Sequence, residues 1–182
     1  MALTGFFVYG GLGAFSTSTT PQATSTPEPT YQTYKVTMTA YNAVPGQTDD
    51  SPEFTSIGVW TNPDIIAARS SDLADELPYG TVIDVLPATT TPNCGYRFVS
   101  EKIGLRVIGD AMNARMRNKI DILMDDEPIR AQAGMLRNPA KALGFCRDVQ
   151  IVVVGHVDTK HIPRTQTALA AAVGLANLAD AK

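Results

Sequence analysis

Residues 105–124 read LRVIGDAMNARMRNKIDILM, and this stretch decides the fold that the sequence predicts. It holds two apolar runs, Leu105 to Ile108 and Ile120 to Met124, joined by a polar segment. Asp110 follows the first run, and Asp121 lies inside the second. Such short apolar runs predict strands, in which successive side chains point to opposite faces. The isoleucines on either side of Asp121 can therefore fill a core while the carboxylate faces a groove.

The two aspartates lie eleven residues apart, and their surroundings point to chemistry. Apolar neighbours raise the pKa of a carboxyl group, and a second carboxylate close by raises it further. A carboxyl group with a raised pKa is suited to general acid catalysis. The alternative is a structural role, in which Asp121 pairs with Arg115 or Lys119 or caps a turn. The spacing alone favours that alternative.

Further strands are expected where short apolar or β-branched runs lie between turn residues. These runs are Tyr34–Tyr41, Ile65–Ala68, Thr81–Leu86, Tyr96–Val99 and Val149–Val157. Six or seven short strands at this spacing predict a small β-barrel rather than an alternation of strands and helices.

Helix formers gather in two places, residues 127–143 and Thr165–Ala181. In the first, Asn138 and Pro139 should break or restart the helix, because proline removes a backbone donor. The second is rich in Ala and Leu, and the sequence leaves open whether it packs on the barrel or stays apart from it.

Composition divides the 182 residues into four parts. An apolar head covers residues 1–15, a Ser/Thr/Pro linker 16–34, the β domain 35–157 and an Ala-rich tail 158–182. The head has the length of a signal-peptide core, although no Lys or Arg precedes Lys35. We therefore expect an exported or membrane-tethered protein, the alternative being a disordered N-terminus on a cytosolic protein.

Composition and charge also exclude several classes of protein. With 44% hydrophobic residues, the chain can build a core and is not globally disordered. A net charge of −3 without a basic cluster argues against nucleic-acid binding. No apolar stretch reaches the roughly 18 residues of a transmembrane helix. No phosphate loop is present either, since the glycines at 10–13 lack a preceding strand, so no cofactor is predicted.

Cys94 and Cys146 lie 52 residues apart, which is neither a metal-site spacing nor a redox motif. In an exported protein they can form a disulfide; two unpaired thiols are the alternative, and both stay open. His156, Asp158 and His161 could together coordinate a metal, but they lack a helical HExxH arrangement. A solvated tail is the better interpretation, and no metal site is predicted.

Four segments in order resemble the 3D domain, a family of bacterial cell-wall proteins named for its three aspartates. They are VTMTAYNAVPGQTDD at 36–50, LPYGT at 77–81, the D-x-M-N-x-R-x-x-N-x-I-D run at 110–121 and ALGFCRDV at 142–149. The resemblance covers about two thirds of the chain. It implies a mainly β fold, a six-stranded double-psi β-barrel with one or two short helices. That barrel is shared with the A-type membrane-bound lytic transglycosylase and stationary-phase muralytic proteins.

The resemblance also implies an activity on peptidoglycan or a related polysaccharide. Lytic members cleave the bond between MurNAc and GlcNAc, and by motif position the acid/base carries over to Asp121 and its supporting carboxylate to Asp110. It further implies a protein of the cell envelope, periplasm or cell surface. The oligomeric state is unknown, and a monomer is assumed.

One position departs from the family pattern. Arg69 stands where the family's first aspartate belongs. Either Asp72 reaches the same groove instead, or the third aspartate is lost. A glycan-binding module without catalysis, like the expansins, is therefore an alternative, as is a structural domain on the Ser/Thr/Pro stalk. A further alternative is a hydrolase of another polysaccharide. In such an enzyme, the distance between the carboxyl groups of Asp110 and Asp121 would set the stereochemical outcome of hydrolysis.

Glycan grooves need aromatic platforms and polar partners. The substrate-binding residues that we expect are Tyr41, Asn42, Asp72, Asn113 and Arg115. Trp60 and Tyr79 are further candidate platforms, and core packing is an equal alternative for Trp60.

Overall fold

The computed structural model describes Met1 and residues 31–45, 51–86 and 94–175. The chain divides into two units, Met1–Thr30 and Tyr31–Lys182, and the fold below belongs to the second. Apart from Met1, the expected head lies outside the described residues, as do residues 16–30 of the expected linker and the end of the Ala-rich tail.

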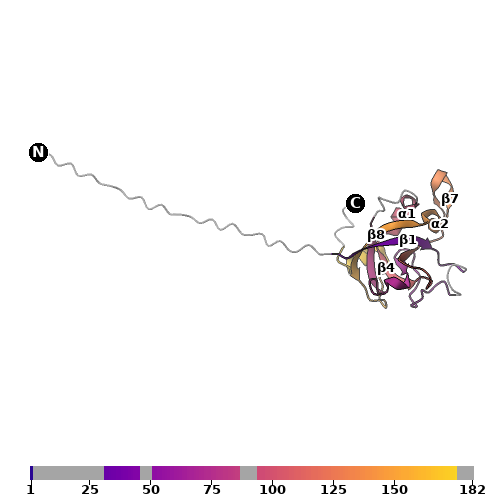
Figure 1. Ribbon diagram of the computed structural model, residues 1–182, viewed down its shortest axis with the longest axis horizontal. Coiled ribbons are helices and arrows are strands. Elements are labelled where there is room, and N and C mark those ends of the chain that lie inside the picture. The colour runs from indigo at the N-terminus through magenta and orange to yellow at the C-terminus, as the bar shows by residue number, and fades with distance from the viewer. Residues whose placement is uncertain (2–30, 46–50, 87–93, 176–182) are drawn as a thin grey trace. The chain divides into compact units, whose positions relative to one another are not determined.

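Six strands close into a barrel in the order β1-β5-β2-β4-β3-β8 (Figure 1). They are β1 Thr33–Tyr41, β2 Ile66–Arg69, β3 Thr81–Val85, β4 Arg106–Ala111, β5 Lys119–Leu123 and β8 Cys146–His156. The β1–β5 and β2–β4 pairs are parallel, and the other neighbours in the barrel are antiparallel. The prediction of a mainly β fold built on a closed six-stranded barrel is confirmed.

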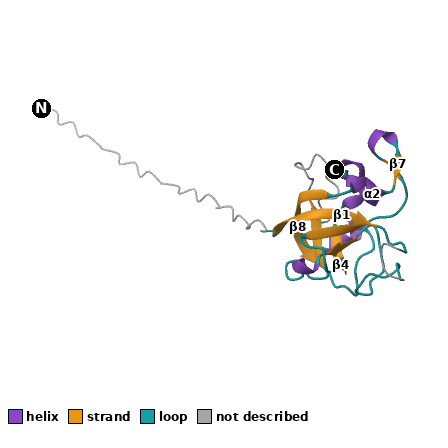
Figure 2. Ribbon diagram, turned by 45° about the vertical axis from the view of Figure 1, so that its right-hand side comes forward, coloured by secondary structure: helices purple, strands orange, loops and turns teal. Residues whose placement is uncertain are grey.

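Short helices lie around the outside of the strands (Figure 2). They are α1 Tyr96–Ile103, α2 Pro139–Leu143 and α3 Gln166–Ala172, with 3₁₀ turns at Ser71–Leu73 and Gln132–Gly134. A small two-stranded hairpin, β6 Ile129–Arg130 and β7 Leu136–Arg137, stands apart from the barrel sheet.

The main core is built from one face of each barrel strand. Its members include Met38, Ala67, Ile108, Ile120 and Ile122, each with no exposed surface. Burying a large aliphatic side chain contributes roughly 1.5–3 kcal/mol, so this core supplies the main stabilising term. Because Ile120 and Ile122 both point into it, the residue between them is turned to the opposite face.

The C-terminal helix packs on the barrel, which answers a question that the sequence leaves open. Leu169 of α3 is fully buried in a second apolar cluster with Ile65 and Val107. At the start of α3, the side-chain amide of Gln166 accepts from the Leu105 N–H at 2.9 Å and donates to the Leu105 carbonyl at 3.0 Å.

Two of the expected elements differ in the structure. The strand expected at Tyr96–Val99 is wrong, because these residues begin helix α1. The buried side chains of α1 are Val99 and Ile103, four residues apart. This is a helical spacing, and it extends beyond the four residues of the expected strand. The helix expected over residues 127–137 is also wrong, because this part forms the β6–β7 hairpin, whereas the restart at Pro139 is confirmed, with Asn138 as its N-cap.

A buried arginine ties several of these elements together. Arg106 has no exposed surface, and its guanidinium donates to the carbonyls of Lys102, Ile103 and Pro63, and to that of Leu123 at 3.2 Å. Burial lowers the pKa of Arg106 to about 10. A buried cation without hydrogen-bond acceptors is very costly, so the fold has to keep these carbonyls around the guanidinium. The hydrogen bonds therefore hold the end of α1 and the segment before β2 against β4 and β5.

Cys94 and Cys146 form a disulfide, which resolves the open question of their state. Their Cα atoms are 5.0 Å apart. The bond joins the segment before α1 to the start of β8, where Cys146 itself is the register partner of Met38 on β1. It therefore links the helical side of the molecule to the barrel.

We expect reduction of this disulfide to lower the free energy of unfolding by about 4 kcal/mol, because a bond across a loop of this length restricts the unfolded chain. Urea unfolding with and without a thiol reductant measures the change. A Cys94→Ser/Cys146→Ala double variant is the control and should not respond to the reductant. Equal midpoints for oxidised and reduced wild type would contradict this prediction.

Candidate active site

The two aspartates of the opening stretch meet on either side of one alanine. In the sheet register, Ala68 of β2 is the partner of Asp110 on β4 and of Asp121 on β5. Ala67 faces the core, so Ala68 and its two partners lie on the opposite face of the sheet. The methyl group of Ala68 leaves space between the carboxylates that a larger side chain would fill.

A bulge in β4 turns Asp110 to this face. The register between β2 and β4 shifts after Ala67, whose partner is Ile108, so that Gly109 is passed over and Asp110 comes opposite Ala68. In a regular strand Ile108 and Asp110 would share a face, and Asp110 would enter the core. A Cβ at Gly109 would lie 2.9 Å from Ile66 Cδ1, so a side chain at this position would require the end of the Ile66 side chain to shift.

A pocket of about 310 Å³ opens over the carboxylate pair. Its lining includes Tyr41, Phe54, Ser56, Ala68, Asn113 and Met116. The strands β1, β2, β4 and β5 form its floor, and the 51–61 and 111–118 loops form its walls.

Asp121 carries the more unusual carboxyl group. Burial raises its pKa to about 6, and the negative charge of Asp110 acts in the same direction. The Thr39 hydroxyl donates to Asp121 Oδ1 at 2.7 Å and, like the positive charge of Lys119, opposes this rise. Among the described residues, Asp121 forms an ion pair with neither Lys119 nor Arg115, the two partners that the structural alternative offered. The Lys119 ammonium lies over the ring of Phe145, 5.4 Å from its centre.

Asp110 is held by three donors. The Tyr41 hydroxyl donates to Oδ2 at 2.7 Å, and the backbone N–H groups of Ser56 and Ala111 donate to Oδ1 at 2.9 and 2.8 Å. Burial and the neighbouring Asp110 hold the pKa of the Tyr41 hydroxyl far above its usual range, so it stays a donor. Three donors thus fix the Asp110 carboxylate in place, whereas the Asp121 carboxyl group accepts a hydrogen bond from the Thr39 hydroxyl.

Tyr41 and Asn113 line the pocket as expected, but three other predicted contacts lie elsewhere. Asn42 is buried and donates to the carbonyls of Met124 and Asp125. Arg115 is exposed, and its guanidinium donates to Asn113 Oδ1 at 3.3 Å.

Asp72 also lies outside the pocket lining. It accepts from the Asn118 N–H at 2.9 Å, and hydrogen bonding from Ser70 is the main cause that lowers its pKa. Asn118 has a positive φ of 49°, so Asp72 secures the turn that leads into β5.

Arg69, which stands where the resemblance to the 3D domain leads us to expect an aspartate, is turned away from the carboxylates. It is buried, its Nε donates to the Leu77 carbonyl at 2.7 Å, and its guanidinium stacks on Tyr79, 4.6 Å from the ring centre. Neither Arg69 nor Tyr79 lines the pocket. The pocket therefore holds two aspartates, and Asp72 does not supply a third.

Trp60 is 61% exposed, so the core-packing alternative is wrong. Its ring meets that of Phe54 edge to face, with centroids 5.5 Å apart. Sequence reasoning missed Phe54, Ser56 and Thr39. Thr39 could have been found, because it shares a strand face with Tyr41, whereas nothing in the sequence links the 51–61 loop to Asp110.

The possible metal ligands do not gather. His156 Nε2 lies 3.0 Å from the Tyr79 carbonyl, whereas His161 pairs with Asp158 at 2.8 Å. Across residues 31–45, 51–86 and 94–175, no three His, Cys, Asp or Glu side chains come close enough to share a metal.

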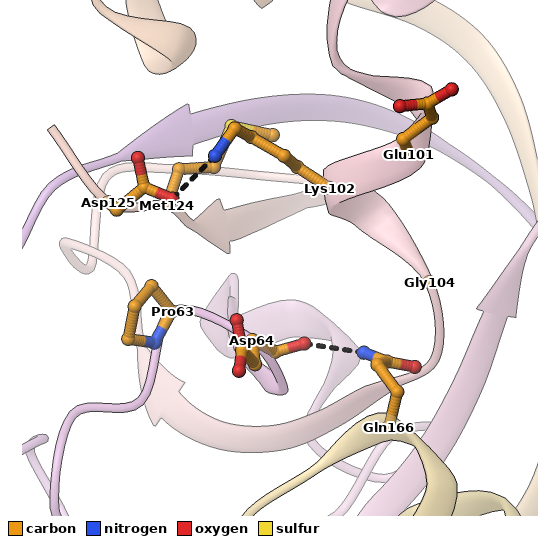
Figure 3. A pocket seen from close by; sticks show the side chains of 8 residues that line it. All are labelled: Pro63, Asp64, Glu101, Lys102, Gly104, Met124, Asp125 and Gln166. Carbon is orange, nitrogen blue, oxygen red and sulfur yellow. Dashed lines mark hydrogen bonds and ion pairs between the residues drawn. The ribbon is translucent and has the colours of Figure 1, made fainter. Parts of the chain in front are cut away.

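A smaller pocket of about 150 Å³ lies at the end of α1 (Figure 3). The Lys102 ammonium reaches across it to Asp125 at 2.8 Å, and the Gln166 amide donates to the Asp64 carbonyl at 2.5 Å. These groups satisfy one another, so this pocket is a less suitable place for chemistry than the carboxylate pair.

Comparison of the sequence with protein-family models and with curated proteins finds no match. Within the described part of the chain, no helix has the length and apolar character needed to span a membrane.

The raised pKa of Asp121 predicts a stability cost that depends on pH. The unfolded chain releases this proton near the ordinary value of 3.8, whereas the folded protein keeps it up to about pH 6. Stability is therefore lost as pH rises between these values, by up to about 3 kcal/mol. Asp121→Asn should remove the loss, because an amide does not ionise and its oxygen can still accept from Thr39.

Thermal unfolding of this variant should show a higher midpoint than wild type at pH 7.5 and a similar midpoint at pH 3.5. Asp75→Asn, at an exposed position, is the matched control and should behave as wild type. A destabilised Asp121→Asn protein at pH 7.5 would contradict the raised pKa.

Proposed function

We propose that this barrel cleaves a glycan of the peptidoglycan type by the lytic transglycosylase reaction, with Asp121 as general acid and base and Asp110 as its electrostatic partner. The observation that carries the proposal is the carboxylate pair flanking Ala68 at an open pocket. One carboxyl group has a pKa raised to about 6, and the other is held by three donors. Such a division between two carboxyl groups suits acid and support roles.

The proposed reaction uses the proton of Asp121 twice. Asp121 first donates it to the glycosidic oxygen between MurNAc and GlcNAc, and the bond from this oxygen to MurNAc C1 breaks. The Asp121 carboxylate then accepts the proton of the MurNAc 6-hydroxyl as the hydroxyl oxygen bonds to C1. The product is a 1,6-anhydro sugar, no water is consumed, and Asp121 is protonated again.

Asp110 has a distinct role in this scheme. Positive charge develops at C1 as the glycosidic bond breaks, and a fixed carboxylate beside it stabilises that charge. Tyr41 and the Ser56 N–H hold the carboxylate in position before the substrate binds. The same negative charge helps to keep Asp121 protonated.

Export to the cell envelope is part of the proposal. The Cys94–Cys146 disulfide supports it, because disulfides persist in oxidising compartments and are rare in the cytosol. Resemblance to the 3D domain over the barrel region supports the same location and the same substrate class.

A glycan-binding module without catalysis is the second candidate. The observation that favours it is Arg69, which is buried under Tyr79 where the family carries its first aspartate. In that case the pocket would bind glycan strands while Asp121 performed no proton transfer.

Asp121→Asn tests the enzyme. The variant should release anhydromuramyl products from purified sacculi at least about 100-fold more slowly than wild type, because a general acid contributes at least this factor. Mass spectrometry of the soluble products measures the rate, and Asp75→Asn is the matched control. Binding to sacculi without anhydro products from wild type would favour the binding module, and unchanged release by Asp121→Asn would remove its catalytic role.

The pH dependence of the rate follows from the same residue. Since the reaction starts from protonated Asp121, the rate should fall above about pH 6, roughly tenfold per pH unit. Thr39→Val removes a hydrogen bond that lowers the pKa of Asp121, so the decline should begin at higher pH. Thr37→Val, on the same strand, is the control. A decline at the same pH in Thr39→Val would show that Asp121 does not set it.

A further inference from the structure

A second, larger hollow adjoins the carboxylate pocket. It has a volume of about 1030 Å³ and runs between residues 57–66 and 159–164. Its lining includes Ile57, Val59, Trp60, Ile162, Lys160 and Arg164, and we call it the Trp60 groove. Thr61 lines both hollows, and Phe54 of the carboxylate pocket touches Trp60 edge to face. A ligand that leaves the carboxylate pair along this side therefore enters the groove.

Trp60 is a fixed and exposed surface rather than a loose side chain. Its loop is closed by bonds from the Thr55 N–H to the Val59 carbonyl and from the Gly58 N–H to the Thr55 carbonyl, both 2.8 Å. Ser56 of this loop donates to Asp110 and accepts from the Ala111 N–H at 3.0 Å. The platform is thereby held at a set position relative to the carboxylate pair.

The chemistry of the groove is apolar with a cationic end. The ionisable side chains in its lining, Lys160 and Arg164, are both cations and both exposed. Arg164 has no ion-pair partner among the described residues, and its carbonyl accepts from Asn62 at 2.9 Å, which fixes its backbone. The nearest acidic group in sequence, Asp158, already accepts from the His161 ring and the Lys160 N–H.

We infer that the Trp60 groove binds the continuation of an acidic glycan, with the apolar face of a sugar ring on Trp60 and a carboxylate substituent at Arg164 and Lys160. An aromatic ring offers a flat apolar surface of the kind that a sugar face covers, and a guanidinium matches a carboxylate with two parallel hydrogen bonds. This inference rests on the proposed function, since it extends the same ligand beyond the carboxylate pair. In this role the Trp60 groove selects glycan strands that carry acidic groups.

Trp60 is the single tryptophan of the chain, so intrinsic fluorescence reports on the groove alone. The experiment uses the full chain in the Asp121→Asn background and soluble peptidoglycan strands with their acidic peptide stems. These strands should change the tryptophan emission on titration, whereas the same strands with amidated carboxyl groups should bind at least about fivefold more weakly.

Two variants separate the platform from the charge. By calorimetry, Trp60→Ala should bind both kinds of strand about tenfold more weakly, whereas Arg164→Gln should lose affinity only for the acidic strands. The matched controls are Phe145→Ala, an equally exposed aromatic outside both hollows, and Arg147→Gln, an exposed cation of β8. Both controls should bind as the parent does.

Each contrary result has a separate meaning. Strands that bind by calorimetry without changing the emission, or with undiminished affinity in Trp60→Ala, would overturn the platform. Equal affinity for acidic and amidated strands would overturn the charge selection. Neither result depends on whether wild type releases anhydro sugars, so failure of the groove and failure of the proposed reaction are distinguishable.

Discussion

The register of strand β2 is the constraint on which the site depends. Its four residues are all buried and pair with β4 on one side and β5 on the other. Because side chains alternate along a strand, this register sends Ala67 to the core and Ala68 to the pocket. A slip of one residue would turn Arg69 toward the carboxylates and Ala68 into the core. The same pairing therefore closes the barrel and brings Asp110 and Asp121 together.

The electrostatics of the site oppose the stability of the fold. Burial raises the pKa of Asp121, and the negative charge of Asp110 adds to this rise. Above that pKa, ionisation of Asp121 lowers the stability of the folded state. The Asp110 carboxylate beside Asp121 accepts hydrogen bonds from the Tyr41 hydroxyl and from two backbone N–H groups. An arrangement that costs stability and serves no packing role is typical of functional sites. The disulfide and the hydrogen bonds from Arg106 to backbone carbonyls stabilise the fold elsewhere and offset this loss of stability.

Asp110 also connects the chemistry to the groove beside it. By accepting from the Ser56 N–H, it anchors the loop that carries Phe54 and Trp60. The aromatic platform and the proposed reacting groups are thus positioned through a single carboxylate. In the proposed scheme, loss of Asp110 would disturb both charge stabilisation and the path of the glycan, whereas loss of Asp121 would leave the path intact.

The sequence by itself determined the mainly β class, most of the barrel strands and the face on which Asp121 lies, because alternation is a local property of the chain. It also indicated Asp110 and Tyr41. It did not determine helix α1, whose Val99 and Ile103 spacing is too short to stand out, or the hairpin that replaces the expected helix before Pro139. Tertiary structure alone decided that Asp110 meets Asp121, since this requires the bulge at Gly109 and a strand some 40 residues earlier in the chain. It alone decided that Asn42 is buried, that Arg69 turns away and that Trp60 is exposed, because each of these outcomes depends on partners distant in sequence.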